Sequence, residues 1–286
     1  YILGNGNYQK THRSYLLHCV GKEHPYVEAA LKCFQTIQEC NFPLFLTPLH
    51  CGETSDTYYC IYHPPLRHNA DNLLSWLQTV SRFPENIVQW ITIHIIITLQ
   101  LLHNKGILFH SLSPEALCFD RDGNIRIRDP FLTPDTTISA QVHQLPEYDP
   151  PEVVKSAPDD YSAHTIAGDY WRLGVFLYEI STGLPPFRET ESIDGDHEQA
   201  LHQIIAEYNP SQLFFPPFTS PQLKDLIINL LQPDISKRFT SLDTILRHPF
   251  LAIVDQRKYD IVYLLTQAEK PEWITQNIIL PLDRDP

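Results

Sequence analysis

The sequence predicts an α+β protein with a small, β-rich amino-terminal part and a larger, mainly helical remainder. Strand-forming residues, several of them aromatic, fill Thr57–Tyr62 near the amino terminus. The longest apolar run, residues 91–102, is interrupted by Thr92, His94, Thr98 and Gln100. This run is too short and too polar for a membrane span, so it predicts a central buried helix.

The amino-terminal part is expected to begin with a strand and then a helix. Residues 15–20 form an apolar, strand-like run, and Pro25 is a suitable first residue for a helix. Val27, Leu31, Phe34 and Ile37 follow at helical spacing and would form its apolar face.

Further along, a hairpin and a long helix are predicted. The turn Asp122-Gly123-Asn124 separates two runs of alternating apolar residues, which is a β-hairpin signal. Residues 169–179 read as a helix that ends at Thr182-Gly183, with Pro185 and Pro186 beyond it.

Composition limits the classes of function. A chain of 286 residues with 43% hydrophobic residues can bury the core of one two-part unit. A formal net charge of −13 argues against nucleic acid or an anionic membrane as the main partner. The six cysteines show no C-x-x-C spacing, and no signal sequence is apparent, so we expect reduced thiols and a cytoplasmic or otherwise intracellular protein. No metal-binding spacing of histidines appears either.

Residues 109–116, Phe-His-Ser-Leu-Ser-Pro-Glu-Ala, resemble the catalytic loop H-R-D-L-K-P-E-N of protein kinases. The alignment places Ser111 at the catalytic Asp, Ser113 at the Lys and Ala116 at the Asn that holds a second Mg²⁺. A serine hydroxyl has no anionic form near neutral pH, and alanine offers no oxygen to a metal. The resemblance to the eukaryotic-type, serine/threonine-like protein kinase superfamily therefore implies a pseudokinase with no intact catalytic residue.

The motifs that shape the large lobe in this family are retained. Asp129 stands at the metal-binding Asp of D-F-G, although Pro130 and Phe131 follow it, and Pro150-Pro151-Glu152 resembles the A-P-E motif. The resemblance implies that Glu152 forms a buried ion pair with Arg238 and that Asp169 holds the backbone of the catalytic loop. Such groups are costly to bury unpaired, which gives a physical reason to keep them after catalysis is lost.

Nucleotide-binding positions in the small lobe are altered. Gly4 and Gly6 resemble a glycine-rich phosphate loop whose third glycine is replaced by Gln9, which would crowd the backbone approach to phosphates. Two registers compete for the strand lysine: His18 in the strand 15–20, or Lys32 in Ala30-Leu31-Lys32. The second leaves only residues 33–41 for the helix that must supply the partner Glu.

Taken with the resemblance, the sequence predicts a bilobal protein-kinase-like domain over residues 1–250. The small lobe is assigned to 1–62, the hinge with its two prolines to 63–66, and the large lobe to 67–250; residues 251–286 form an extension packed on the large lobe. We expect no enzyme activity, no ATP or Mg²⁺ as cofactor, and at most vestigial binding through Gly4, Gly6, His18 and Asp129, with Asp129 as the only metal ligand.

The expected function is that of a scaffold or allosteric regulator whose partner is another protein, such as an active kinase or another enzyme. The alternative is a divergent nucleotide-binding transferase or weakly active kinase that uses non-standard groups such as His110 or His18.

Overall fold

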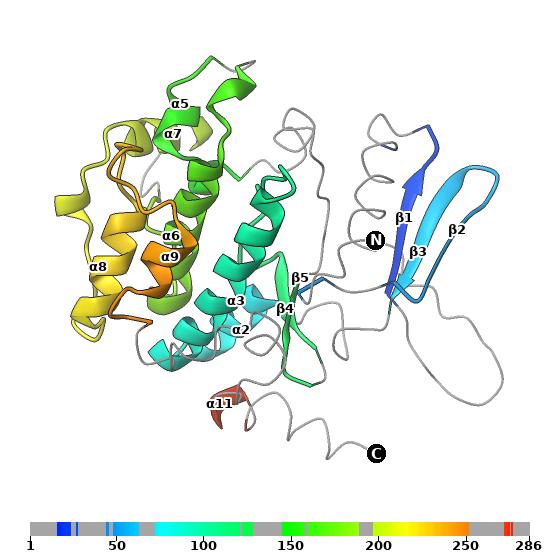
Figure 1. Ribbon diagram of the computed structural model, residues 1–286, viewed down its shortest axis with the longest axis horizontal. Helices are drawn as coiled ribbons and strands as arrows, with labels where there is room; N and C mark the ends of the chain where they lie inside the picture. The colour runs from blue at the N-terminus through cyan, green and yellow to red at the C-terminus, as the bar shows by residue number, and fades with distance from the viewer. Residues whose placement is uncertain are drawn as a thin grey trace.

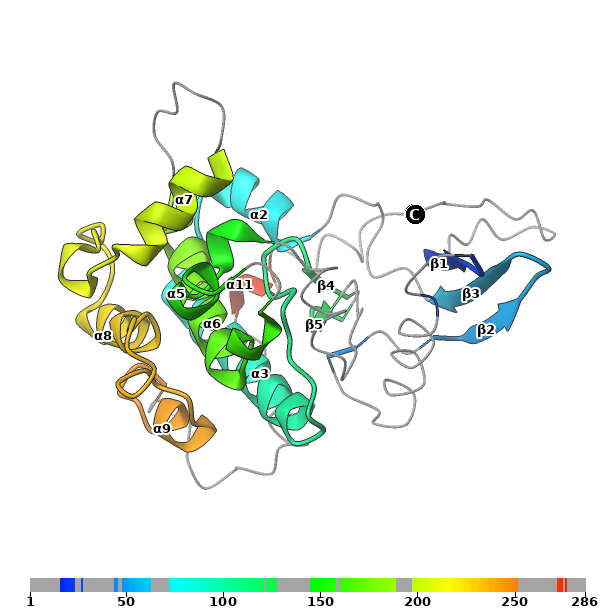
Figure 2. The same cartoon turned by 90° about the horizontal axis from the view of Figure 1, so that it is seen from above.

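A small antiparallel sheet and a larger set of helices make up the described part of the chain, with a short hairpin between them (Figure 1). The structure is a computed structural model, and it describes residues 16–23, 27, 44–45, 48–62, 72–120, 122–127, 145–157, 160–188, 197–251, 272–274 and 276. The sheet and the helices occupy opposite ends of the molecule in both views (Figure 2), as expected for a small and a large lobe. The predicted α+β class is confirmed.

The sheet has the strand order β1-β3-β2, with β1 at Leu16–Gly21, β2 at His50–Glu53 and β3 at Thr57–Tyr62. Both pairings are antiparallel, and His18 of β1 lies opposite Cys60 of β3. The predicted strands at 15–20 and Thr57–Tyr62 are confirmed. Val27 is helical, in the segment where a helix is predicted to follow β1. The choice between His18 and Lys32 stays a prediction, because Lys32 lies outside the described residues.

Two cysteines of this sheet form a disulfide, so the expectation of reduced thiols is wrong for Cys51 and Cys60. They are direct partners in the antiparallel pair of β2 and β3, with their Cα atoms 4.2 Å apart. This pairing depends on strand register, and a search for C-x-x-C spacing cannot detect it. Cys19 and Cys118 are not disulfide-bonded.

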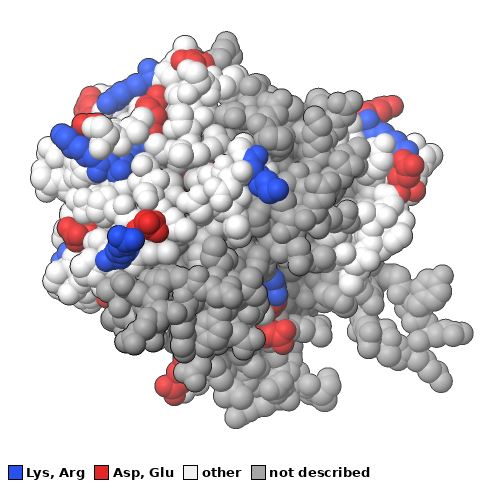
Figure 3. Space-filling view, viewed as in Figure 1, with Lys and Arg blue, Asp and Glu red and all other residues white. Residues whose placement is uncertain are grey.

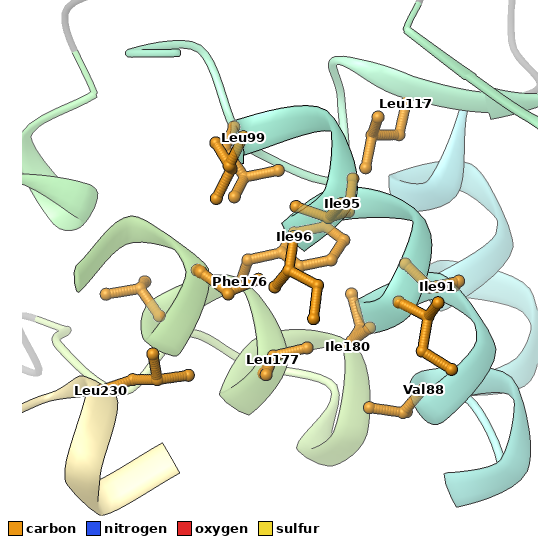
Figure 4. Packing of buried hydrophobic residues seen from close by; sticks show 14 of the residues in the cluster. Val88, Ile91, Ile95, Ile96, Leu99, Leu117, Phe176, Leu177, Ile180 and Leu230 are labelled. Atoms are coloured by element: carbon orange, nitrogen blue, oxygen red, sulfur yellow. The ribbon is translucent and has the colours of Figure 1, made fainter. Parts of the chain in front are cut away.

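The helical lobe is built around two long helices, α3 (Glu85–His103) and α6 (Ile166–Thr182), which pack against each other (Figure 4). The predicted helix at 91–102 lies within α3. By length and composition α3 could cross a membrane, but 72% of its most apolar window is buried within the fold, as in a core helix. Around the pair lie α2 (Leu73–Val80), α5 (Pro151–Val154), α7 (His197–Ala206), α8 (Pro221–Leu230) and α9 (Leu242–Leu246), with short 3-10 turns at Pro146–Tyr148, Tyr161–Ala163 and Pro210–Gln212.

Close packing of α6 on α8 depends on Gly174. A Cβ atom at this position would lie 2.8 Å from Leu231 Cδ2 and 3.0 Å from Leu230 Cβ, both too close for ordinary contact. The sequence Trp171-Arg172-Leu173-Gly174 thus fixes how tightly the central helix can approach its neighbour.

A two-stranded hairpin, β4 (Leu117–Phe119) and β5 (Ile125–Ile127), lies between the sheet and the helices (Figure 1). Its turn is the predicted one: Gly123 has φ +74°, and the Asp120 carboxylate accepts hydrogen bonds from the amides of Asp122 and Asn124. An isolated bridge from Phe45 to Ile127 adds a third segment to the hairpin. The hairpin follows residues 109–116 directly and so positions the candidate site.

Residues beyond 251 are described only in part. Ile274, in the short helix α11 (Glu272–Ile274), is fully buried and belongs to the same hydrophobic core as α3 and α6. The assignment of residues 251–286 to an extension packed on the large lobe stays a prediction, because most of these residues lie outside the described part of the chain.

Candidate functional site

The segment 109–116 is a buried loop between α3 and β4, and its backbone is held from two sides. The amide of Phe109 donates to Asp169 Oδ2 at 2.7 Å, and the amide of Leu74 donates to the carbonyl of Pro114 at 3.2 Å. Within the loop, the Ala116 amide donates to the Ser113 carbonyl and hydroxyl oxygens, at 3.2 and 3.3 Å. The loop shape is therefore set by backbone contacts.

The side chains that would carry chemistry in this loop are small and buried. Ser111, at the position of a catalytic carboxylate, is 6% exposed, and its hydroxyl has no hydrogen-bond partner among the described residues. Ser113 is also buried, and Ala116 has no oxygen that could bind a metal. These three positions retain neither the charge nor the metal ligand that phosphoryl transfer uses.

Asp169 is the centre of the polar contacts behind the loop. Besides the Phe109 amide, its Oδ2 atom accepts a hydrogen bond from His103 Nε2 at 2.8 Å, and Arg172 Nη1 lies 3.8 Å from Oδ1. The carboxylate is completely buried. The structure thus brings Asp169 to the loop backbone in the way that the family resemblance implies.

Arg172 is a buried cation that the sequence reading did not single out. It is 2% exposed, donates to Asp149 Oδ1 at 3.2 Å, and lies one helical turn after Asp169. Burial raises the pKa of Asp149, and the Arg172 guanidinium opposes that rise. The i,i+3 spacing of Asp169 and Arg172 was the available signal for this pair. Neither Asp149 nor His103 could be joined to them by spacing, because both are distant in sequence.

His110 of the loop packs against a second histidine, His164. The rings of His110 and His164 pack edge to face with their centroids 5.1 Å apart. Burial and the nearby Arg172 charge lower the pKa of His164 to about 4, although Asp169, Asp160 and Glu152 oppose the shift. His164 is therefore neutral near neutral pH. His110, which the alternative hypothesis considered as a catalytic group, is buried here rather than open to a substrate.

Glu152 and Arg238 form a bidentate ion pair. The two guanidinium nitrogens donate to the two carboxylate oxygens at 2.7 and 2.8 Å, and the Arg238 side chain is fully buried. Arg238 also donates to the carbonyl oxygens of Ala167 and Gln232, and its guanidinium lies 5.1 Å from the ring centre of Trp171. All donor groups of this cation have acceptors. Through them Arg238, which lies between α8 and α9, links Glu152 of α5 to Ala167 at the start of α6.

Several predicted site residues lie outside the described part of the chain: Gly4, Gly6, Lys32, Asp129 and the hinge at 63–66. For His18 only the backbone position in β1 is described. Among the described residues there is no group of three His, Cys, Asp or Glu side chains that could hold a metal ion. The assignments to phosphate and metal binding therefore remain predictions.

Comparison with known proteins places the chain in context. The family model described as "Protein kinase domain" matches residues 13–251. A RAC family serine/threonine-protein kinase homolog of Dictyostelium discoideum is 30% identical over 82% of this chain and 50% of its own length. The cAMP-dependent protein kinase type 3 of Saccharomyces cerevisiae is 30% identical over 75% of this chain and 52% of its own length. A probable cAMP-dependent protein kinase catalytic subunit of Encephalitozoon cuniculi is 31% identical, over 80% and 66% respectively. The chain thus spans about half the length of the first two relatives.

These comparisons correct two expectations. The relatives are named as protein kinases, which points to a kinase enzyme, so the expectation of a non-enzyme is wrong. The expectation that neither ATP nor Mg²⁺ serves as cofactor is wrong for the same reason, because protein kinases transfer a phosphoryl group from ATP with Mg²⁺. The first expectation rested on Ser111, Ser113 and Ala116, and the second rested in addition on the altered small-lobe positions, Gln9, His18 and the hinge prolines.

Proposed function

Because this chain belongs to the protein kinase family, we propose that it is a divergent phosphotransferase that uses ATP to modify protein hydroxyl groups with a slow chemical step. The observation that carries the proposal is the anchoring of the loop at Phe109 by the buried Asp169 carboxylate. That contact keeps the loop backbone in place between α3 and the hairpin. Positioning of this kind is the larger part of what a protein contributes to phosphoryl transfer.

The substitution at Ser111 explains why the step is expected to be slow. With no carboxylate there, no group at this position accepts the proton of the attacking hydroxyl. General-base catalysis contributes roughly 10²–10⁴-fold in rate, so we expect turnover lower than that of an ordinary kinase by about this factor. The transition state is loose in most analyses, so the reaction can proceed without the base as long as the reactants are positioned.

The residues of this chain supply only some of the ligands that Mg²⁺ has in the family. When bound, Mg²⁺ neutralises the charge of the ATP phosphates, and Asp129, two residues after β5, would supply one ligand. Ala116 cannot supply a second. The described residues do not complete a metal site, so the role assigned to the loop here is positioning of the protein substrate.

A second function, regulation of a partner protein by binding, is supported by a different observation. The family's structural contacts at Asp169 and Arg238 are present although Ser111, Ser113 and Ala116 differ from the family pattern. A fold maintained in this way can present a binding surface whatever its turnover. We propose an intracellular location in keeping with ATP as donor, although the Cys51–Cys60 disulfide points the other way.

Nucleotide binding and transfer can be measured separately. Thermal unfolding is followed with ATP alone and with ATP plus Mg²⁺ or Mn²⁺, because a ligand that binds the native state raises the midpoint by mass action. We expect a metal-dependent rise that Asp129→Ala abolishes. Transfer of labelled phosphate to a generic protein substrate should be slow and equally sensitive to Asp129→Ala. Absence of both the thermal shift and the transfer at millimolar ATP contradicts the phosphotransferase proposal.

A further inference from the structure

The Cys51–Cys60 disulfide joins the outer strand of the described small sheet to its middle strand, and only one of the two cysteines is open to solvent. Cys51 lies in β2, at one end of the order β1-β3-β2, and is partly exposed. Cys60 lies in β3 and is only 2% exposed. The strand β2 has four residues, and Leu49 just before it is 49% exposed. A reagent from solvent can therefore reach the disulfide at Cys51, whereas Cys60 is shielded.

Backbone hydrogen bonds on both sides of the disulfide hold β2 beside β3 without it. Before β2, the Leu49 amide donates to the Ile61 carbonyl at 2.7 Å. After β2, the Thr54 amide donates to the Thr57 carbonyl at 2.8 Å and closes the turn between the strands. We therefore expect the two cysteines to stay opposite each other when the bond between their sulfur atoms is broken.

The turn after β2 is also tied to the end of β1. The Lys22 amide donates to the Asp56 carbonyl at 2.8 Å, and Lys22 Nζ lies 2.8 Å from Glu53 Oε2. Figure 3 shows these opposite charges side by side at the tip of the sheet. A surface ion pair contributes little stability, but the backbone bond fixes the position of the turn. The sheet thus has contacts that keep its register with the disulfide open or closed.

The other cysteine of this sheet, Cys19, is not placed to react with the pair. It lies opposite Tyr59, the residue before Cys60. Successive residues of a strand point to opposite faces of a sheet, so Cys19 is on the other face from the disulfide. Cys19 is exposed and not disulfide-bonded. It therefore serves as an internal control for the chemistry of the Cys51–Cys60 pair.

The proposed use of ATP bears on the role of the disulfide. Thiols inside cells are kept reduced, and disulfides that form there are usually transient or redox-sensing, whereas permanent structural disulfides belong to oxidising compartments. A disulfide that opens and closes in the folded protein is compatible with a chain that uses ATP inside the cell.

Resting on the proposed function for this intracellular setting, we propose that Cys51–Cys60 is a reversible redox site, opened by a dithiol reductant of the thioredoxin class, that sets how firmly β2 is held in the sheet. A thiolate of the reductant attacks Cys51 Sγ, the bond between the two cysteines breaks, and Cys60 leaves as a thiolate that takes up a proton. The second thiol of the reductant then attacks the mixed disulfide, which releases Cys51 as a thiol and the reductant as a disulfide.

Opening transfers two electrons from the dithiol to the protein. Closing uses the same exchange with a disulfide such as oxidised glutathione. One cysteine thiolate attacks it and releases the first glutathione thiol. The other cysteine then displaces the second glutathione thiol from the mixed disulfide and restores the bond.

Opening is expected to loosen β2 without unfolding the sheet. Within the described sheet β2 pairs with β3 alone, so a four-residue strand loses its covalent link and keeps one neighbouring strand. Short edge strands with few buried contacts open locally at low cost in free energy. Cys60 also lies opposite His18, so the change occurs one strand away from a position predicted to bind nucleotide.

Thiol counting on the folded full chain tests the site. The protein is incubated with thioredoxin and dithiothreitol without denaturant, blocked with N-ethylmaleimide and mapped by mass spectrometry. We expect Cys51 and Cys60 to be blocked together after reduction and protected again after treatment with oxidised glutathione, while Cys19 reacts in both states. Reduction that requires enough urea to unfold the chain, or cysteines that do not link under oxidation, would overturn the proposal.

The order of attack is tested with a thioredoxin variant that lacks its second active-site cysteine and so stays attached to its target. We expect the mixed disulfide to form at Cys51 and to be lost in Cys51→Ser. The matched control Cys19→Ser should trap as much thioredoxin as the unsubstituted chain. A mixed disulfide at the buried Cys60 would contradict the proposed attack.

Hydrogen–deuterium exchange measures how firmly β2 is held. We expect reduction to speed exchange of the β2 amides by at least about tenfold, with a smaller change in β1. Cys51→Ser should exchange at the faster rate with and without reductant, whereas Cys19→Ser should keep the redox response. Equal exchange of β2 in the oxidised and reduced unsubstituted chain would refute the proposed effect, whether or not Cys51→Ser folds.

These measurements are made without ATP, so they separate the redox site from the phosphotransferase proposal. A chain that transfers no phosphate can still show reversible opening of the disulfide. A disulfide that resists thioredoxin in the folded chain leaves the assays of nucleotide binding and transfer unaffected. Circular dichroism in each redox state confirms that the chain and its variants are folded.

Discussion

Two neighbouring positions of the loop 109–116 differ sharply in their hydrogen bonds to the rest of the protein. At Phe109 the backbone is fixed by a buried carboxylate that also contacts His103 and Arg172. Two residues further on, the hydroxyl of Ser111 is buried with no partner among the described residues. The comparison teaches that the groups that hold the loop and the groups that would act in it are under separate physical constraints. Removing the first leaves unpaired buried charge, whereas changing the second costs the fold little.

The largest loss of stability is expected when Asp169, the residue that holds the loop backbone, is replaced. Replacing it with Ala leaves Arg172 and the loop backbone without their buried acceptor, so the free energy of unfolding should fall by about 3–5 kcal/mol. Urea denaturation measures the change. Asp234→Ala is the matched control, because Asp234 also faces a basic residue at i+3, Lys237, but on the surface. It should change stability little, and equal losses for the two variants would show that burial is not the cause.

A somewhat smaller loss is expected at the second buried pair. Arg238→Met keeps most of the side-chain volume but removes the bonds to Glu152, so unfolding should become easier by about 3 kcal/mol. Adding Glu152→Gln removes the carboxylate left uncompensated and should recover part of the loss. A double-mutant cycle on chemical denaturation measures the coupling. If the two losses add without coupling, the ion pair does not act as a unit.

Next in size is a pH effect centred on His164. Its pKa falls from 6.5 when unfolded to about 4 when folded, so the unfolded chain binds more protons between these values. The stabilising contribution is complete above about pH 6.5 and is lost as the pH falls toward 4. Because the ring is partly exposed, we expect no more than about 2 kcal/mol. Unfolding at pH 7 and pH 5 should show a smaller difference in His164→Gln than in the unsubstituted chain; an identical difference would exclude His164 as the source.

The smallest change in stability is expected at Ser111, the buried loop residue that does not hold the loop. Ser111→Ala removes a buried hydroxyl that makes no hydrogen bond to the described residues, so stability should change by less than about 1 kcal/mol and in the stabilising direction. Thermal and urea unfolding both report it. A large loss would mean that Ser111 takes part in the framework.

Patterns in neighbouring residues predicted much of the fold. The strand Thr57–Tyr62, the turn at Gly123 and the core helix α3 each follow from local periodicity or turn chemistry. The Cys51–Cys60 disulfide escaped prediction because it depends on strand register rather than on spacing along the chain.

The residues of the candidate site likewise fall into those that the sequence indicated and those that it did not. The resemblance of single motifs located Asp169, Glu152 and Arg238, but it did not indicate Arg172, Asp149 or His103. Arg172 lies three residues after Asp169 on the same helix, so helical spacing could have indicated it. His103 meets Asp169, and Asp149 meets Arg172, only through tertiary packing. Reading lost catalytic groups as lost enzyme activity was wrong because the sequence of one loop reports on proton transfer, whereas the family comparison concerns the whole domain.

The most direct test of the account restores the loop residues on the existing framework. The triple variant Ser111→Asp, Ser113→Lys and Ala116→Asn is compared with the unsubstituted chain for transfer of labelled phosphate from ATP to a generic protein substrate. If the framework still positions the loop, transfer should rise by about 10²-fold or more in a variant that remains folded. A folded triple variant with no gain in transfer would contradict the claim that this framework still supports catalysis.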